Sequence, residues 1–312
     1  MQLTAIIPAH HPHRGRLART LAALAAQTLP AENWETLLVD NASTPALDLA
    51  SLPPEHPRNL RLLVEPTLGL TAARRHGLRA AQGEFCVLVD DDNVLTPSYL
   101  ADVIRVFSTN PQIGAIGGPS RPEFETPPPA WAREFLSLLA LRDLGSHAIV
   151  TGLERARDGP HFAYPGCAPI GAGMAVRRTA ALAWVEAAAD PALSDRRGPA
   201  LSSGGDNDIV LAILHAGWKV GYFPELSLTH LIPSGRIDPD YLARLNYGIQ
   251  KSWVEVLARH DACPWPPIPR WTLPLRTARA WFRAHAWRSP AHHIRWQGLC
   301  GRFHGQAALL TR

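Results

Sequence analysis

Three consecutive aspartates, Asp90, Asp91 and Asp92, are the residues of this 312-residue chain whose spacing most directly implies chemistry. They follow residues 85–89, an apolar segment typical of a buried strand. Like charges this close repel one another unless a cation lies among them, and hard divalent cations prefer carboxylate oxygens. The run therefore indicates a metal site, although aspartates at a strand end also serve as turn formers or helix caps.

A second acid follows a similar apolar segment. Asp40 comes directly after residues 35–39, which also have the composition of a buried strand. For Asp40 alone, a role as a turn former is as well supported as a ligand role. Ligands of open α/β sheets bind beyond the carboxyl ends of the strands. We therefore expect Asp40 and the three consecutive aspartates to converge on a metal and nucleotide site.

The elements that must position these acids alternate between strand and helix. Short connections join apolar runs to segments with helical spacing of leucine and alanine, an alternation that predicts a doubly wound α/β sheet. The expected strands are residues 3–7, 35–39, 60–64 and 85–89, and the expected helices are residues 16–27 and 70–81.

Two glycine-rich nucleotide-binding motifs are absent from the sequence. No GxGxxG follows the first expected strand, and no GxxxxGK[ST] occurs. A Rossmann dinucleotide site and a P-loop are therefore disfavoured. Phosphate charge would instead have to be met by a metal held on carboxylates.

The second half of the chain adds glycines, acids and a histidine that could face a ligand. Gly171 and Gly173 would let the backbone approach a ligand closely, although a tight turn explains them nearly as well. Asp206 follows two glycines and can face a cleft, whereas Asp208 has the position of a helix cap. His230 stands alone, and a lone histidine is more often structural than a ligand.

Taken together, these segments resemble the family 2 glycosyltransferases, which use nucleotide sugars and have the GT-A fold. The resemblance runs from about residue 3 to residue 232 and rests on motifs in a fixed order, ending with His230. The matching segments are AIIPAHH, LLVDNAS, GLTAARRHGLRAAQGEFCVLVDDDN and GGDNDIVLAILHAGWKVGYFPE. It implies a GT-A-like doubly wound mixed sheet in a nucleotide-sugar-binding catalytic domain, residues 1–235, followed by a helical segment, residues 236–312.

The resemblance also implies a role for each matching residue. Asp40 would contact the base or ribose of the nucleotide. Asp90 and Asp92 would be the two acids of the DxD motif, with Asp92 nearest a divalent metal, Mn²⁺ or Mg²⁺, and His230 close to that metal. Asp206 matches the aspartate that acts as general base. The residues expected to bind the nucleotide sugar are Pro8, Asp40, Arg74, Asp90, Asp91, Gly171 and Gly173.

The implied activity is an inverting transfer of a sugar, of the hexosyltransferase type, in polysaccharide or glycolipid biosynthesis. The donor would be a nucleoside diphosphate sugar, with a UDP-sugar favoured, and the acceptor a hydroxyl group of a glycan or a lipid-linked molecule. A divalent metal offsets the charge that develops on the leaving diphosphate, and a carboxylate takes the acceptor's proton.

The sequence departs from the family pattern at two places. Gly205 replaces the glutamate that commonly precedes the catalytic aspartate, which leaves Asp208 as a reserve candidate for the base. The Gln-x-x-Arg-Trp motif of processive synthases is missing, so addition of single sugars is expected. Two alternatives remain open: a catalytically inactive protein that binds sugar nucleotides or glycans, and a nucleotidyltransferase.

The C-terminal segment, residues 261–312, has a distinct composition. It carries eight arginines against one acid, Asp261, and five of the ten tryptophans. One interpretation is peripheral contact with an anionic membrane, because tryptophan and arginine both favour that surface. The other is a helical cap packed on the catalytic domain, which the many prolines of the segment favour slightly. The body lacks a recognised nucleic-acid-binding module, so no nucleic-acid partner is expected.

Sequence features also bear on location. No stretch approaches the roughly 18 apolar residues of a membrane-spanning helix. The N-terminus lacks the pattern of a secretory signal, and the four cysteines form no paired clusters. We expect a cytoplasmic protein, peripheral at the inner membrane face if residues 261–312 bind lipid.

Overall fold

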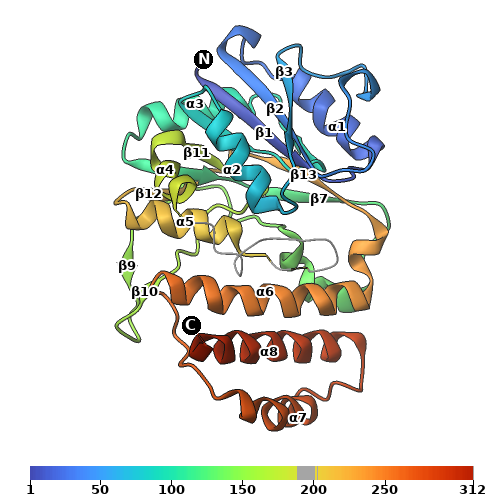
Figure 1. Cartoon of the computed structure of the whole chain (residues 1–312), viewed down its shortest axis with the longest axis vertical. Coiled ribbons are helices and arrows are strands. Elements are labelled where there is room, and N and C mark those ends of the chain that lie inside the picture. The colour runs from blue at the N-terminus through green and yellow to red at the C-terminus, as the bar shows by residue number, and fades with distance from the viewer. Residues whose placement is uncertain (188–200, 202, 312) are drawn as a thin grey trace.

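An eight-stranded mixed sheet forms the upper part of the molecule, and long helices form its lower end (Figure 1). The computed structural model describes residues 1–187, 201 and 203–311. The strand order is β3-β2-β1-β4-β11-β6-β12-β8, and β11 and β8 run antiparallel to their neighbours. The strands are β1 (Leu3–Ala9), β2 (Trp34–Asn41), β3 (Leu60–Glu65), β4 (Phe85–Leu88), β6 (Ile113–Gly117), β8 (Ile149–Thr151), β11 (Ala175–Arg177) and β12 (Lys219–Tyr222). The predicted doubly wound mixed sheet is confirmed.

Helices cover both faces of this sheet. They are α1 (Arg14–Ala25), α2 (Leu70–Ala80), α3 (Tyr99–Thr109), α4 (Arg178–Glu186) and α5 (Gly205–His215). Successive strand residues point to opposite faces, so Ile6 joins the core beneath α2, α4 and α5, whereas Ile7 joins the core beneath α1 and α3. Because β1 and β2 are buried throughout their length, their sequences are continuous apolar runs rather than alternating ones.

A second sheet of three strands lies beside the carboxyl end of β4. Its strands are β5 (Asn93–Leu95), β13 (Leu228–Ile232) and β7 (Ser120–Phe124). Strand β13 pairs with β5 in a register that sets His230 opposite Asn93, and the Leu231 amide donates a hydrogen bond to the Asp92 carbonyl. This pairing carries His230 to the three aspartates, which are far from it in sequence. A separate pair consists of β9 (Glu154–Arg155) and β10 (Phe162–Ala163).

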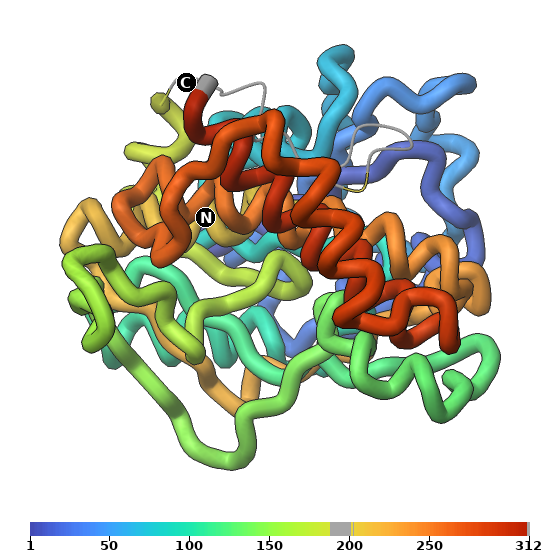
Figure 2. The backbone as a smooth tube through the Cα atoms, turned by 90° about the horizontal axis from the view of Figure 1, so that it is seen from below, coloured from blue at the N-terminus to red at the C-terminus, as the bar shows by residue number. Residues whose placement is uncertain are grey.

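Three α-helices form successive layers below the sheet (Figure 1, Figure 2). They are α6 (Pro239–Arg259), α8 (Pro290–Ala308) and, outermost, α7 (Leu273–Arg283). The Asp238 carboxylate caps α6 by accepting hydrogen bonds from two backbone amides of the first turn. Helix α8 approaches α6 so closely that a Cβ atom at Gly301 would meet the Tyr247 carbonyl.

Helix α6 is also joined to the rest of the chain. It shares an apolar core with α8 and the 3₁₀ helix η3 (Ala130–Leu139). Shorter 3₁₀ helices complete the structure: η1 (Ala31–Asn33), η2 (Leu49–Ser51), η5 (Ser234–Ile237), η6 (Arg270–Thr272) and η7 (Leu309–Thr311). The division into domains at residue 235 stays a prediction. Of the described helices, none has the length and apolar character needed to cross a bilayer.

Candidate active site

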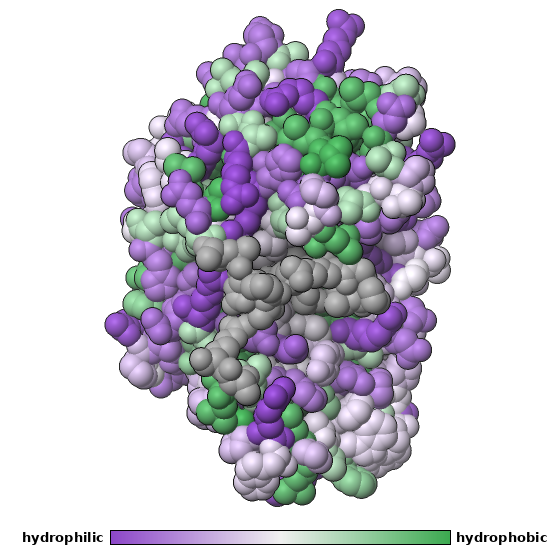
Figure 3. Space-filling model, viewed as in Figure 1, coloured by the Kyte–Doolittle hydropathy of each residue, from purple (hydrophilic) through white to green (hydrophobic). Residues whose placement is uncertain are grey.

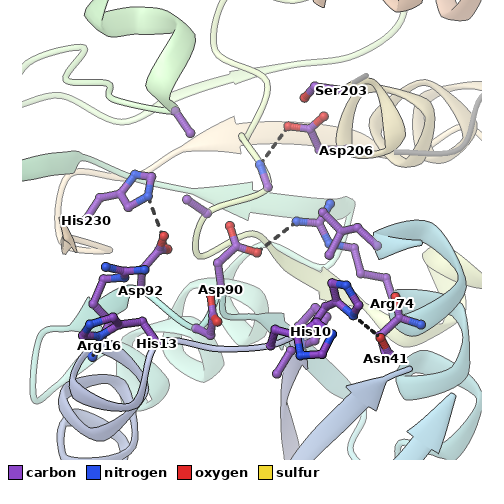
Figure 4. A pocket seen from close by; sticks show the side chains of 18 of the residues that line it. His10, His13, Arg16, Asn41, Arg74, Asp90, Asp92, Ser203, Asp206 and His230 are labelled. Carbon is purple, nitrogen blue, oxygen red and sulfur yellow. Dashed lines mark hydrogen bonds and ion pairs between the residues drawn. The ribbon is translucent and has the colours of Figure 1, made fainter. Parts of the chain in front are cut away.

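A cavity of about 350 Å³ opens at the carboxyl ends of β1 and β4, between the sheet and the start of α5 (Figure 4). This is where open α/β sheets bind their ligands. The predicted site residues that line it are Pro8, Arg74, Asp90, Asp91, Asp92, Gly171, Asp206 and His230. The remaining two, Asp40 and Gly173, are not among its lining residues.

Asp40 is fully buried at the end of β2. Its carboxylate accepts hydrogen bonds from the amides of Ser43 (3.2 Å) and Leu47 (2.9 Å), so it holds the loop that follows the strand. The next residue, Asn41, lines the cavity instead. Its side-chain oxygen accepts a hydrogen bond from the Gly69 amide at 2.7 Å, which fixes the start of α2. A direct contact between Asp40 and a nucleotide stays a prediction.

Gly171 and Gly173 occupy different environments. Gly173 has φ +73°, and a Cβ atom there would meet the side chains of Leu228 and Tyr99, so its glycine serves a tight buried turn. Gly171 faces the cavity, where its amide donates to Asp206 Oδ2 at 3.0 Å. A Cβ atom at Gly171 would lie 2.7 Å from Arg74 Nη2.

Arg74 supplies positive charge to the cavity wall from α2. Its side chain is almost completely buried, and Nη2 lies 3.3 Å from Asp90 Oδ1. Asp90 is more exposed and points into the cavity (Figure 4). The Asp90 carboxylate therefore faces the cavity, while the buried Arg74 guanidinium beside it partly balances its charge.

The three aspartates form a tight turn after β4. The Asn93 amide donates to the Asp90 carbonyl at 3.0 Å, and Asn93 Nδ2 donates to Asp92 Oδ1 at 3.1 Å. Partial burial, together with the charges of Asp92 and Asp90, raises the pKa of Asp91 to about 7. A cation bound at this turn would relieve that repulsion.

Asp92 and His230 meet at the cavity wall. His230 Nε2 lies 3.3 Å from Asp92 Oδ1, and Arg236 Nη2 lies 3.7 Å from Asp92 Oδ2. Both Asp92 and His230 are buried, and His230 Nδ1 has no hydrogen-bond partner among the described residues.

The Asp92 carboxylate offers oxygen ligands to a divalent cation such as Mn²⁺ or Mg²⁺, and His230 Nε2, which faces the same carboxylate, offers a nitrogen beside them. Within the described part of the chain, no group of three or more His, Cys, Asp or Glu side chains could hold a metal alone. A metal here would need further oxygen ligands from a bound phosphate.

Two acids at the start of α5 face opposite directions. Asp206 lies at the cavity, and its two oxygens accept hydrogen bonds from the amides of Gly171 and Asn207. Asp208 is buried on the other side of the helix. It accepts a hydrogen bond from Trp184 Nε1 at 2.7 Å, and His260 Nε2 lies 2.8 Å from it. Burial alone would raise the pKa of Asp208, but hydrogen bonding with His260, the charge of Arg259 and the Trp184 hydrogen bond hold it below its usual value.

Several lining residues were missed by the sequence analysis. They are His10, His11, His13, Arg16, Asn41, Ser203 and Arg236. His10 Nδ1 lies 2.7 Å from the Asn41 carbonyl, which ties the end of β1 to the end of β2. Arg16, Arg74 and Arg236 give the cavity cationic walls around its acids, a distribution suited to a polyanionic ligand that carries its own cation. The sequence signal for Arg16 and Arg236 was their position shortly after a strand that ends at the site.

Comparison with solved structures finds the same fold. Residues 1–349 of S. aureus TarS are 14% identical, with a TM-score of 0.50 over 100% of this chain and 92% of that one. The mannosyltransferase PcManGT from Pyrobaculum calidifontis, solved with GDP-Man and Mn²⁺, is 19% identical, with a TM-score of 0.55 over 99% of this chain and 78% of that one. At these identities the likeness shows the fold alone.

Comparison of sequences gives the family. No curated protein matches the chain. The family model described as glycosyl transferase family 2 matches residues 4–178, which is more than half of the chain and includes β1, β2, β4 and the three aspartates. The chain therefore belongs to glycosyl transferase family 2 and is a glycosyltransferase with the GT-A fold.

Proposed function

We propose that the cavity binds a nucleoside diphosphate sugar, with a UDP-sugar favoured, and transfers its hexose to a hydroxyl group of a glycan or lipid-linked acceptor. The observation that carries this proposal is the placement of Asp206 across one cavity from the Asp92–His230 pair (Figure 4). A base and a cation-binding pair on opposite walls leave room for a sugar between them.

Asp92 and His230 would hold Mn²⁺ or Mg²⁺ together with oxygens of the diphosphate. When bound, the metal offsets the charge that develops on the leaving diphosphate. The position of His230 Nε2 at 3.3 Å from Asp92 Oδ1 and the crowding of three carboxylates support this assignment. So does the presence of Mn²⁺ and GDP-Man in PcManGT, which has the same fold.

The cationic side chains would bind and orient the diphosphate. Arg74 is fixed by its burial and by its ion pair with Asp90, so it presents its charge with little loss of side-chain entropy. Arg16 and Arg236 line the same cavity and add charge around the phosphates. Pro8 and Asn41, at the ends of β1 and β2, would border the nucleoside.

Asp206 would act as the general base. Two backbone amides hold its carboxylate at the cavity, and each oxygen keeps a lone pair that can accept the acceptor's proton. A single base beside a single sugar site fits direct displacement, which inverts the anomeric centre. Helix α5 turns the reserve candidate, Asp208, towards the interior.

Calorimetry tests donor binding and its metal dependence. We expect UDP or GDP to bind with Mn²⁺ and to lose affinity by at least tenfold on chelation or in Asp92→Asn. The matched control is Asp158→Asn, which changes an exposed aspartate. Equal affinity with and without metal would contradict the role of Asp92 and His230. Donor binding without transfer to any acceptor or water would favour an inactive sugar-nucleotide-binding protein.

A further inference from the structure

The outermost helix, α7, lies at the lower end of the molecule (Figure 1). A stripe of exposed apolar side chains runs along this helix and the residues next to it. Leu275, Ala278 and Phe282 are spaced by three and four residues, which places them on one face of α7, and Trp271 lies in the 3₁₀ helix η6 directly before it. The exposed fractions are 81% for Trp271, 61% for Leu275 and 66% for Phe282. The buried residue Ala280 lies on the opposite face, against α8.

The tryptophans of this segment divide into two roles. Trp281 packs edge-on against Trp296 at 4.7 Å between ring centroids, and Trp296 Nε1 donates to the Thr277 carbonyl at 3.0 Å. These two fasten α7 to α8. Trp287 packs near Phe282 at 6.0 Å and remains 55% exposed, so it extends the stripe beyond the end of the helix.

Arginines surround the stripe. They are Arg270, Arg276, Arg279, Arg283 and Arg288, all of them exposed, and none forms an ion pair with a residue that the structure describes. No acid follows Asp261 in the sequence. Apolar and strongly hydrophilic residues accordingly lie side by side at this end of the molecule (Figure 3).

We propose that this surface, Arg270–Arg288, docks the enzyme on an anionic lipid bilayer. Exposed tryptophan and phenylalanine insert at the headgroup level, and arginine is attracted to the lipid phosphates. Two copies of the chain joined by this surface would bring like charges together, which opposes self-association. The docking surface is separated from the cavity by α8 and α6, so lipid binding and donor binding can be measured independently.

Co-sedimentation of the full chain with vesicles tests the proposal. Wild-type protein is expected to sediment with an equal mixture of phosphatidylcholine and phosphatidylglycerol and to stay in solution with phosphatidylcholine alone. Arg276→Gln/Arg279→Gln/Arg283→Gln should bind about 100-fold more weakly, since each arginine near the surface contributes about fivefold. Trp271→Ser/Phe282→Ser should lose about as much, because two exposed rings no longer enter the bilayer. Matched controls are Arg58→Gln/Arg157→Gln and Leu49→Ser/Val64→Ser, which change exposed residues elsewhere and should bind like wild type.

A second readout separates insertion from charge alone. Trp271→Phe/Trp287→Phe should still bind the anionic vesicles, because phenylalanine rings replace the two tryptophans. Brominated lipids in these vesicles should quench the tryptophan fluorescence of wild type more than that of this variant. The proposal is wrong if wild type stays in solution with both vesicles or binds both equally. It is also wrong if Trp271→Ser/Phe282→Ser has the thermal midpoint of a folded protein and still sediments with anionic vesicles like wild type. If the protein is a dimer that Trp271→Ser dissociates, the surface binds a second copy of the chain instead. If the surface binds a DNA duplex and not vesicles, its partner is a nucleic acid.

Discussion

Asp206 and Asp208 stand two residues apart, yet they have opposite environments. The Asp206 carboxylate lies at the cavity, whereas that of Asp208 is enclosed by Trp184 and His260. Both belong to the first turn of α5, where a carboxylate is favoured by the helix dipole. The proposed base and the buried acid therefore share chemical type and helix position, and only the direction in which each side chain points separates them.

At the residue scale, Asp206→Asn should lose transfer by about 10²–10⁴-fold, because the amide cannot take the acceptor's proton. Donor affinity should stay within about twofold, since Asp206 is proposed to take the acceptor's proton and not to bind the donor, and the remaining side-chain oxygen can still accept from one of the two amides, Gly171 or Asn207. Single-turnover transfer and donor calorimetry measure the two effects. An active Asp206→Asn beside a folded but inactive Asp208→Asn would assign the base to the other acid.

Gly171→Ala tests the contact between the Gly171 turn and Arg74. The added Cβ atom would lie 2.7 Å from Arg74 Nη2, so the guanidinium must shift from the position in which it contacts Asp90. Loss of one charge-assisted contact to the diphosphate should weaken donor binding by about tenfold or more. Gly166→Ala is the matched control because a Cβ atom there would meet nothing within 4 Å. Equal donor affinity in the two variants would argue against Arg74 as a phosphate ligand.

At the scale of elements, the buried Asp208 joins α4, α5 and the end of α6. It contacts Trp184 of α4, Arg259 of α6 and the following His260. The folded-state pKa of Asp208 is lowered, so its carboxylate stabilises the fold above the unfolded value of about 4 and loses that contribution as pH falls through the folded value.

We expect Asp208→Asn to lower the free energy of unfolding by about 2 kcal/mol at neutral pH, because one partner of a buried pair is removed. The deficit should shrink as the pH falls below about 4, because the Asp208 carboxyl of the unfolded wild-type chain takes up a proton there, and it should vanish once the pH is below the lowered folded-state pKa. Denaturant unfolding at several pH values measures it, with the exposed Asp158→Asn as control. A deficit that does not change with pH would show that the Asp208 charge is not what stabilises the contact.

The contact between α6 and α8 depends on small residues. A Cβ atom at Gly301 would meet the Tyr247 carbonyl, which belongs to a helix backbone and cannot rotate away. Gly301→Ala should therefore destabilise the fold by about 1–3 kcal/mol through forced separation of the helices. Gly235→Ala, where a Cβ atom would meet nothing within 4 Å, should change the unfolding midpoint little. Similar midpoints for both variants would refute this packing argument.

At the scale of the whole molecule, α8 covers an apolar face of α6 that also packs on η3. A chain ended at residue 260 would expose that face, including Leu242 and Leu245. We expect this truncation to aggregate or to unfold at a clearly lower temperature, whereas a chain ended at residue 308 keeps α8 and should behave like the full chain. A 1–260 chain with the thermal midpoint and donor affinity of the full chain would show that α7 and α8 are dispensable for folding.

The sequence by itself determined the parts that depend on local pattern. Apolar runs closed by Pro8, Asp40 and Asp90 predicted the central strands, and the strand-end position of the acids predicted the sheet edge at which the cavity opens. Ordered motifs predicted the family and its fold, as the family match and the solved neighbours confirm. These properties can be predicted locally for two reasons. A buried strand must be apolar along its length, and the direction of the chain defines the carboxyl end of each strand, where ligands of such sheets bind.

Only the tertiary structure decided which side chains face the ligand space. The pairing of β13 with β5 brought His230 to Asp92, and the turn at Gly171 met Asp206, although each pair is far apart in sequence. In the folded chain the Asp40 side chain points to the loop after β2, where it accepts a hydrogen bond from the Leu47 amide, whereas Asn41 and Arg236 line the cavity. One residue of shift at a strand end changes the face to which a side chain points, and that choice depends on partners supplied by other segments.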